Sequence, residues 1–208
     1  MIAPTAVVFV VDDDASVRKS LSRLISAAGY RVHAYASPQD FLARERQSGP
    51  SCLVLDVRMP GVTGLELQQT LASAAHEIPI IFITGHGDIP MGIKAMKAGA
   101  VDFLTKPFVA KELLEAIRRA VAKDTRDLGT EAREDEIRAR AKLLTPRESQ
   151  VFALVVTGML NKQIASELGI GEKTVKVHRA RVMEKMQAGS LAALVRLADA
   201  AGIKVTNA

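Results

Sequence analysis

The first 122 residues alternate short apolar segments with amphipathic ones, and this alternation restricts the fold more than any other feature of the chain. Segments that are apolar along their whole length are typical of strands buried on both faces. Amphipathic segments between them are typical of helices that cover a sheet. We therefore expect an α/β domain with a doubly wound, five-stranded parallel sheet. The expected strands are residues 6–11, 31–35, 51–55, 79–84 and 101–105, and the expected helices are residues 15–28, 38–46, 64–74, 89–98 and 110–122.

Polar and charged residues follow these apolar strands at their carboxyl ends. In an open parallel sheet those ends lie along one edge, where functional groups collect. The first and third strands both end in aspartates, which predicts one acidic pocket, and Asp14 is also placed to cap the following helix. The fourth and fifth strands add a hydroxyl and an amine to the same edge. The residues concerned are Asp12, Asp13, Asp14, Asp56, Thr84 and Lys106.

The aspartates of this pocket predict a site for a hard divalent cation. Asp12, Asp13 and Asp56 would repel one another, and Mg²⁺ or Mn²⁺ with oxygen ligands relieves that repulsion. With such a cation to neutralise the incoming charge, a carboxylate can attack a phosphoryl group. Lys106 would place a positive charge on one phosphoryl oxygen, and Thr84 would donate a hydrogen bond to another. The set matches what the phosphorylation of an aspartate requires.

These residues, together with the loop Arg58-Met59-Pro60-Gly61, resemble the signature of a response-regulator receiver domain over residues 6–122. The resemblance implies the flavodoxin-like fold of CheY. It implies that Asp56 accepts a phosphoryl group from a sensor histidine kinase. It also implies that Asp13, Asp56 and the backbone carbonyl of Arg58 bind Mg²⁺ directly, and that Asp12 acts largely through water.

The same resemblance implies a conformational switch beside the phosphorylation site. Thr84 is the expected switch hydroxyl, Phe103 is the expected switch aromatic residue, and Lys106 is expected to contact the phosphoryl group. The Lys106–Pro107 peptide bond is expected to be cis, a geometry that only proline makes energetically accessible.

The segment from residue 85 to residue 103 is similar to the corresponding part of FixJ-type regulators. His86 stands two positions after Thr84, where the family tunes the lifetime of the phosphoryl group, although it fits an exposed loop histidine equally well. We expect phosphorylation to produce a homodimer through the helix that follows. The expected dimer contacts in this region are Met91, Lys94, Ala95 and Val101.

Residues 123–142 differ from the rest of the chain in composition. Twelve of these twenty residues are charged, with as many acids as bases. An apolar stripe is nearly missing, which disfavours a helix packed on one domain. We expect a solvated linker that is mostly helical and extends the helix at residues 110–122.

Residues 143–208 predict a compact domain of four short helices. The run Thr145-Pro146-Arg147-Glu148 is a capping box with proline at the first helical position. Asn161 and Ser190 are placed to cap the second and fourth helices. The order of a capped helix, a short helix and a basic helix predicts a helix-turn-helix within a four-helix unit. The expected helices are residues 146–157, 162–168, 172–186 and 191–200.

The helix expected at residues 172–186 has one basic face. Residues 143–208 carry nine bases against five acids, so the basic surplus of the chain is concentrated at this end. Val175, Val182 and Met186 share one side of the helix and are expected to face the core. The opposite side has the composition of a recognition helix that reads the major groove of duplex DNA. It carries Lys173, Lys176, Val177, Ala180 and Arg181.

Three blocks, at residues 144–148, 161–165 and 174–178, resemble the LuxR-type DNA-binding domain of NarL-like regulators. The resemblance spans about residues 143–200 and implies contacts with bases and phosphates, and a dimer surface on the last helix. His178 also fits internal packing. The expected base contacts are Lys176 and Val177, the expected phosphate contacts are Lys162, Thr174 and His178, and the expected dimer contacts include Leu194 and Val195.

The leading hypothesis is a transcription regulator, and not a turnover enzyme, in which phosphorylation of Asp56 drives dimerisation and promoter binding. A Mg²⁺-dependent phosphatase with an aspartyl-phosphate intermediate would share the carboxylates, but it usually has a second aspartate two residues after its nucleophile, where this chain has Arg58. A receiver whose C-terminal domain binds only protein is a third possibility, and the basic helix face argues against it.

Two further expectations concern the cellular location and the single cysteine. The chain has no signal-peptide pattern and no apolar run of the roughly 20 residues that a membrane helix needs, so a cytoplasmic location is expected. Cys52 is the only cysteine, and its place inside an apolar strand predicts a small core residue.

Overall fold

The computed structural model describes residues 6–45, 47–72, 78–85 and 89–202. The chain divides into two compact units, residues 1–128 and 129–208. One long helix, α5 (Ala110–Lys142), contributes residues to both units, and each unit is described by itself. Among the described residues, no helix is both long enough and apolar enough to cross a membrane.

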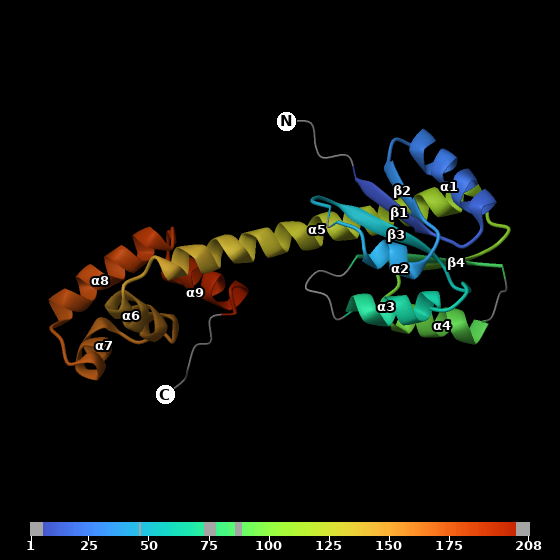
Figure 1. Ribbon diagram of the computed structural model, residues 1–208. Helices are drawn as coiled ribbons and strands as arrows, with labels where there is room; N and C mark the ends of the chain where they lie inside the picture. The colour runs from blue at the N-terminus through green and yellow to red at the C-terminus, as the bar shows by residue number, and fades with distance from the viewer. Residues whose placement is uncertain (1–5, 46, 73–77, 86–88, 203–208) are drawn as a thin grey trace. The chain divides into compact units, whose positions relative to one another are not determined.

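The first unit is built around a parallel sheet with the strand order β2-β1-β3-β4-β5 (Figure 1). Helices connect successive strands, so the expected doubly wound α/β fold is confirmed. The strands are β1 (Val7–Val11), β2 (Arg31–Tyr35), β3 (Ser51–Asp56), β4 (Ile80–Thr84) and β5 (Asp102–Thr105), and the helices before α5 are α1 (Ala15–Ala27), α2 (Pro38–Leu42), α3 (Gly64–Ala72) and α4 (Ile89–Lys97).

Alternate residues of the central strands face two separate cores. Phe9 and Leu53 belong to the core that also contains residues of α2, α3 and α4. Val10 and Val54 belong to the core that α1 and α5 cover. Figure 1 shows these two groups of helices on opposite sides of the sheet. Cys52 is fully buried in the second core, where burial raises the pKa of its thiol, so the expectation of a core residue is confirmed.

Helix α2 is shorter than the sequence pattern predicts. It ends at Leu42, whereas the expected helix ran to residue 46, which lies outside the described residues. The backbone nitrogen and Nη1 of Arg44 both donate to the carbonyl oxygen of Phe41, at 3.3 and 2.8 Å. That carbonyl would accept from Glu45 in a continued helix. The guanidinium of Arg44 also stacks on the Phe41 ring, 3.6 Å from its centroid, which stabilises the turn.

The described part of the second unit contains four helices after the end of α5, and they pack around an apolar core. The expected capping box is present, since Thr145 N donates to Glu148 Oε2 at 2.8 Å and Glu148 N donates to Thr145 Oγ1 at 3.3 Å. Val175, Val182 and Met186 are fully buried, as the helical periodicity predicts. The helices are α6 (Pro146–Val156), α7 (Asn161–Leu168), α8 (Glu172–Lys185) and α9 (Leu191–Ala200).

The expected cap of α7 needs correcting. Leu160, not Asn161, is the N-cap residue, and Gln163 Oε1 accepts from its backbone nitrogen at 2.8 Å. Asn161 Oδ1 instead accepts a hydrogen bond from Arg179 Nη1 at 3.1 Å. The polar side chain therefore joins α7 to α8, a contact that a search for local caps does not consider.

The expectation of a solvated linker needs correcting at two residues. Residues 123–142 are helical as part of α5, but two of their side chains are buried. Asp124 is completely buried in the first unit and accepts a hydrogen bond from the backbone nitrogen of Ser51 at 2.7 Å. Ile137 is buried in the core of the second unit. One buried residue in each unit is too sparse a pattern to be recognised as an apolar stripe.

A buried ion pair joins α6 to α8 in the second unit. Glu148 is 2% exposed, and its Oε2 accepts from Lys185 Nζ at 2.6 Å. The same ammonium donates to the carbonyl oxygen of Leu143 at 3.0 Å. The hydrogen bond from Lys185, followed by that from Thr145, lowers the pKa of Glu148 to about 2. The ionised carboxylate therefore stabilises this unit.

We expect this ion pair to give the second unit an acid-sensitive stability. Because the folded-state pKa of Glu148 is depressed from 4.5 to about 2, its contribution is present above pH 4.5 and is lost as the pH falls toward 2. Glu148→Gln should lower the free energy of unfolding near neutral pH and flatten its dependence on pH in this window. Urea denaturation of the full chain, followed by circular dichroism at several pH values, measures both effects. Glu167→Gln, at an exposed position on α7, is the matched control, and equal behaviour of the two variants would contradict the prediction.

Candidate functional site

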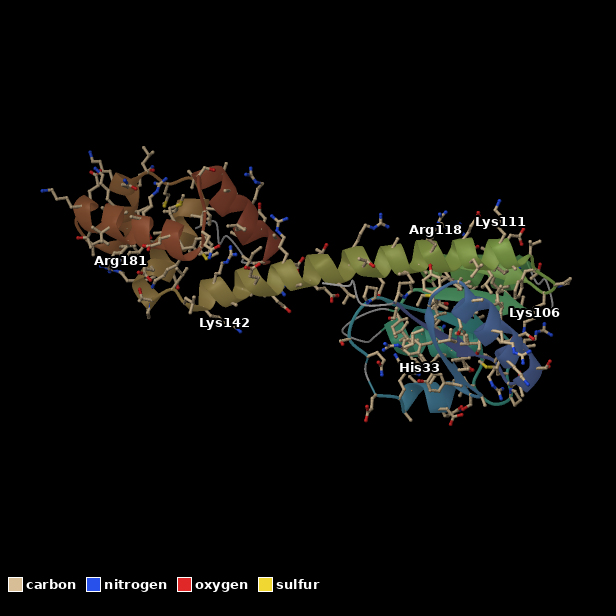
Figure 2. The ribbon with its side chains drawn as sticks, turned by 90° about the horizontal axis from the view of Figure 1, so that it is seen from above. His33, Lys106, Lys111, Arg118, Lys142 and Arg181 are labelled. Atoms are coloured by element: carbon tan, nitrogen blue, oxygen red, sulfur yellow. The ribbon has the colours of Figure 1, made fainter. Side chains whose placement is uncertain are left out.

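The carboxyl ends of β1, β3 and β5 bring two aspartates and a lysine together. Asp12 and Asp56 are 1% and 6% exposed. Lys106 Nζ lies 2.8 Å from Asp12 Oδ2 and 2.8 Å from Asp56 Oδ1, and so bridges the two carboxylates. Figure 2 labels Lys106 at this end of the first unit. The parallel register of β1 with β3 and of β3 with β4 aligns the strand ends that produce this cluster.

Backbone groups hold both carboxylates in place. Asp12 Oδ1 accepts from the backbone nitrogen of Asp14 at 2.9 Å, and Asp56 Oδ2 accepts from that of Arg58 at 2.8 Å. Gly64 opens α3 against the same loop, where a Cβ atom would collide with the carbonyl oxygen of Asp56. A side chain at residue 64 is therefore incompatible with the path of the loop after β3.

Burial and the neighbouring charges act in opposite directions on this cluster. Desolvation raises the pKa of Asp56, and its hydrogen bond to Lys106 compensates only in part, so the net pKa is above 3.8. For Lys106, burial lowers the pKa, but hydrogen bonds to Asp12 and Asp56 outweigh it and the net pKa is raised. Lys106 therefore stays protonated at neutral pH. Burial makes the ionised form of Asp56 less stable than that of an exposed aspartate.

The donor set fits a divalent cation such as Mg²⁺. Asp13 is exposed next to Asp12, and its carboxylate has no hydrogen-bond partner in the described part of the chain. Within the described ranges, no three acidic, histidine or cysteine side chains are grouped as a preformed metal site. Mg²⁺ does not require one, because it binds through one or two carboxylates and keeps several waters. Two buried carboxylates that share a single ammonium, with a third beside them, leave an excess of negative charge.

The two expected switch residues lie on neighbouring strands. Thr84 ends β4 and is 1% exposed, and its carbonyl oxygen accepts from the backbone nitrogen of Lys106 at 2.6 Å. Phe103 on β5 is partly buried, 6.4 Å from Phe82 between ring centroids. Gly92 on α4 faces the Phe103 ring, since a Cβ atom there would lie 3.2 Å from it. The Lys106–Pro107 peptide bond is cis, as expected.

The expected dimer contacts on and after α4 are only partly at the surface. Ala95 is fully buried, so its side chain cannot contact a second protein and that expectation is corrected. Lys94 is exposed, whereas Met91 and Val101 are partly buried against the cores of this unit. The sequence pattern missed two exposed apolar side chains of α4, Ile93 and Met96, which are 51% and 45% exposed. His86 lies outside the described residues.

Helix α8 presents its basic side to solvent. Val177 is 50% exposed, on the side of the helix opposite the buried Val175 and Val182. Lys176 forms an exposed ion pair with Glu172 at 3.3 Å, a contact of little energetic consequence. Arg181 is exposed on the same helix (Figure 2). The exposed residues of the expected DNA-binding set are Lys162, Lys173, Thr174, Lys176, Val177, Ala180 and Arg181.

Two other expected residues of the second unit lie deeper than the surface. His178 is partly buried, and its Nδ1 atom is buried with no hydrogen-bond partner among the described residues, which favours internal packing of the ring. Leu194 is fully buried in the core, so its assignment to a dimer surface is corrected. Val195 is partly buried against the same core.

The comparisons with known proteins cover both units. Residues 8–118 match the response regulator receiver domain, and residues 142–198 match the bacterial regulatory proteins of the luxR family. Nodulation protein W of Bradyrhizobium diazoefficiens is 48% identical over 202 residues, which are 97% of this chain and 89% of that protein. The transcriptional regulatory protein FixJ of Rhizobium meliloti is 47% identical over 198 residues, 94% of this chain and 96% of that protein.

Among solved structures, the response regulator StyR superposes with a TM-score of 0.82 at 47% identity, over 94% of this chain and 98% of that chain. These matches extend over nearly the whole chain. They therefore cover both the unit with the acidic cluster at its strand ends and the helical unit with the exposed basic helix. The chain belongs to the FixJ-type two-component response regulators, transcription regulators that combine a receiver domain with a LuxR-type DNA-binding domain.

Proposed function

We propose that Asp56 accepts a phosphoryl group from a sensor histidine kinase and that this modification controls promoter binding. The observation that carries the proposal is the bridge of Lys106 between Asp56 and Asp12, at 2.8 Å on each side. Residues 1–122 would receive the phosphoryl group, residues 123–142 would link the domains, and residues 143–208 would bind DNA.

In the transfer step, a carboxylate oxygen of Asp56 forms a bond to phosphorus while the phosphorus–nitrogen bond of a phosphohistidine breaks. The imidazole nitrogen leaves and takes up a proton. The Lys106 ammonium, which is already within 2.8 Å of Asp56 Oδ1, stabilises the negative charge of the phosphoryl oxygens. The reacting carboxylate must be ionised, and its raised pKa means that acid conditions slow the step.

Asp13, Asp56 and the backbone carbonyl of Arg58 would hold Mg²⁺, which supplies charge neutralisation to the incoming phosphoryl group. Asp12 accepts hydrogen bonds from Lys106 and from the backbone nitrogen of Asp14, so its carboxylate orients the lysine and would act on the cation through water. Thr84 would donate its hydroxyl to the phosphoryl group, and Phe103 would move with it.

A groove beside Lys106 supports docking of the kinase. It encloses about 310 Å³ between α1 and the loop after β5. Leu21, Leu24 and Phe108 give it an apolar lining, and Ser16 and Ser20 give it hydroxyl groups. A kinase helix placed there would present its phosphohistidine at the edge of the sheet that carries Asp56.

The DNA contacts are assigned to the exposed side of α8. Lys176 and Val177 would enter the major groove, where an ammonium suits guanine and a branched apolar side chain suits the thymine methyl group. Lys162 and Thr174 would contact phosphates. Dimerisation would use the exposed apolar side chains of α4, Ile93 and Met96, with Lys94 beside them.

The test is phosphorylation with acetyl phosphate and Mg²⁺, followed by DNA binding. Intact-mass spectrometry should show one added phosphoryl group, and analytical ultracentrifugation should show a larger dimer fraction. Duplexes selected from a random pool against the phosphorylated protein should bind it more tightly than the unmodified protein. Equal affinity of the two forms for every selected duplex would contradict control by phosphorylation.

A further inference from the structure

A pocket in the second unit lies away from the residues assigned to DNA. It encloses about 400 Å³ between the last turns of α5 and helix α9. Small-molecule sites in proteins begin at about 300 Å³. None of the exposed α8 residues assigned above to DNA lines this pocket. The pocket is thus a second concave surface of the DNA-binding unit, with no role in the proposed phosphotransfer.

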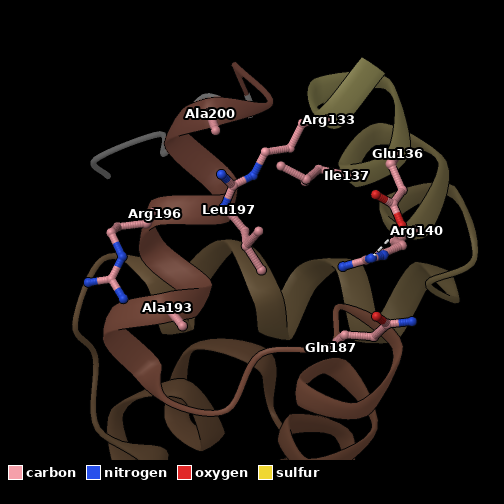
Figure 3. Close-up of a pocket in the computed structure, with 9 residues that line it drawn as sticks. All are labelled: Arg133, Glu136, Ile137, Arg140, Gln187, Ala193, Arg196, Leu197 and Ala200. Carbon is pink, nitrogen blue, oxygen red and sulfur yellow. Dashed lines mark hydrogen bonds and ion pairs between the residues drawn. The ribbon is translucent and has the colours of Figure 1, made fainter. Parts of the chain in front are cut away.

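The α5 wall of this pocket has a regular chemical pattern. Arg133, Ile137 and Arg140 are separated by four and three residues, so they lie on one face of the helix. The two arginines are seven residues apart, which is about 10 Å along the helix axis. Figure 3 shows their guanidinium groups extending from α5 toward α9. The wall therefore has an apolar centre with a positive charge at each end.

The opposite wall and one end complete the site. Leu197 and Ala193 of α9 line the opposite wall, and Figure 3 shows the Leu197 side chain extending from α9 into the space between the helices. Gln187 lines the end near Arg140, and with a φ of 54° it is the one non-glycine residue in the described part of the chain with positive φ. Such a backbone conformation is costly for a residue with a Cβ atom. Gln187 therefore places a side-chain amide at the pocket, at a position whose backbone conformation favours glycine.

The charges in the pocket are not balanced. Among the described residues that line it, Glu136 is the one acid, and its carboxylate is paired with Arg140 Nη2 at 2.6 Å. Arg140 Nη1 donates to the carbonyl oxygen of Met186 at 3.5 Å. Arg133 has no hydrogen bond or ion pair within the described ranges. Arg196 is exposed at the outer side of α9 and adds positive charge at the rim. Guanidinium groups bind carboxylates and phosphates through two parallel hydrogen bonds.

We propose that this pocket binds a small elongated anion that has a carboxylate or phosphate group at each end and an apolar or neutral centre. Arg133 binds one end. The Gln187 amide binds the other end together with Arg140, which exchanges its pair with the exposed Glu136 carboxylate for the ligand. Ile137 and Leu197 contact the centre. The ligand bridges α5 and α9, so its binding adds a small-molecule input to the DNA-binding unit that does not depend on Asp56.

The experiment uses the full chain without Mg²⁺ at constant ionic strength, and measures affinity by isothermal titration calorimetry. The probes are suberate, which has carboxylates at both ends of eight carbons, octanoate, which has one, and fructose 1,6-bisphosphate. We expect saturable one-to-one binding of suberate or the bisphosphate, and binding of octanoate at least about tenfold weaker, since one charged pairing is lost. The tighter-binding of suberate and the bisphosphate identifies the chemistry of the ends.

Arg133→Gln is the decisive variant, because Arg133 has no partner in the described part of the chain and its replacement breaks no hydrogen bond or ion pair there. It should weaken binding of the tighter probe about tenfold. Arg118→Gln, at an exposed position on the same helix but in the first unit, removes the same charge and should bind like the wild type. Equal affinities of suberate and octanoate, or equal effects of the two substitutions, would overturn the proposal. Amide resonances of Gln187 and Ala193 should shift on titration.

Discussion

Asp56→Asn is expected to abolish phosphorylation by acetyl phosphate and Mg²⁺, and with it the increase in DNA affinity. The amide that replaces the carboxylate is not nucleophilic, and neither Asp12 nor Asp13 can replace it. Both carboxylate oxygens of Asp12 accept hydrogen bonds, Oδ1 from the backbone nitrogen of Asp14 and Oδ2 from Lys106. Asp13 is exposed to solvent and has no hydrogen bond to Lys106. Intact-mass spectrometry measures the labelling directly.

The same variant should be more stable than the wild type, which separates lost chemistry from lost folding. The folded-state pKa of Asp56 is raised above 3.8, so ionisation of this group lowers the free energy of unfolding as the pH rises past that value. Asparagine has the same shape without the charge, and the melting temperature of the first unit should therefore increase at neutral pH. Asp40→Asn, an exposed position on α2, is the matched control and should be labelled normally. A fully labelled Asp56→Asn protein would end the assignment.

Lys176→Ala is expected to cause the largest loss of DNA affinity among single substitutions in the second unit. Its ammonium is exposed and held only by a 3.3 Å pair with Glu172, so its loss has little effect on folding. A lost base contact costs about 1–3 kcal/mol, roughly a 5- to 150-fold weakening for the preferred duplex. Fluorescence anisotropy with the selected duplexes and with base-substituted versions measures the loss.

The control for this experiment is Lys142→Ala, which removes the same charge from an exposed position at the end of α5. It should change affinity little and leave sequence preference unaltered. A base contact predicts relaxed specificity at one position of the duplex, whereas a phosphate contact predicts uniform weakening and a smaller salt dependence. Identical binding curves for Lys176→Ala and the wild type would exclude α8 from the groove.

The sheet and its acidic edge could be predicted because both follow from chain-local rules. A strand buried on both faces is apolar throughout, as in β1 and β3, and the residue after it lies at the sheet edge. The strand pattern is therefore sufficient to place Asp12 and Asp56 at this edge. Lys106 is expected beside them because parallel strands that are neighbours end at the same edge of the sheet. The structure adds that Lys106 bridges both carboxylates, which strand order alone does not give.

The features that were missed depend on pairing between distant segments. The sequence identifies Glu148 as part of a capping box, but its partner Lys185 is 37 residues away, and no local rule connects the two residues. Asp124 looks like one charge among many in residues 123–142, yet it is buried against the start of β3. Ala95 and Leu194 illustrate a different problem. An apolar residue on an amphipathic helix suits a core and an interface equally, so the pattern alone does not distinguish the two.

The ammonium of Lys185 has a consequence for how activation can work. At the end of α8, it holds the carbonyl of Leu143, just after α5, and the carboxylate that begins α6. A rotation of α8 relative to the rest of its unit would break the ion pair between Lys185 and Glu148. A movement of the whole second unit leaves both hydrogen bonds of Lys185 intact, because both partners belong to that unit. We therefore expect the DNA-binding surface to keep the same internal structure when Asp56 is phosphorylated. Phosphorylation would make this surface accessible to DNA without changing its shape.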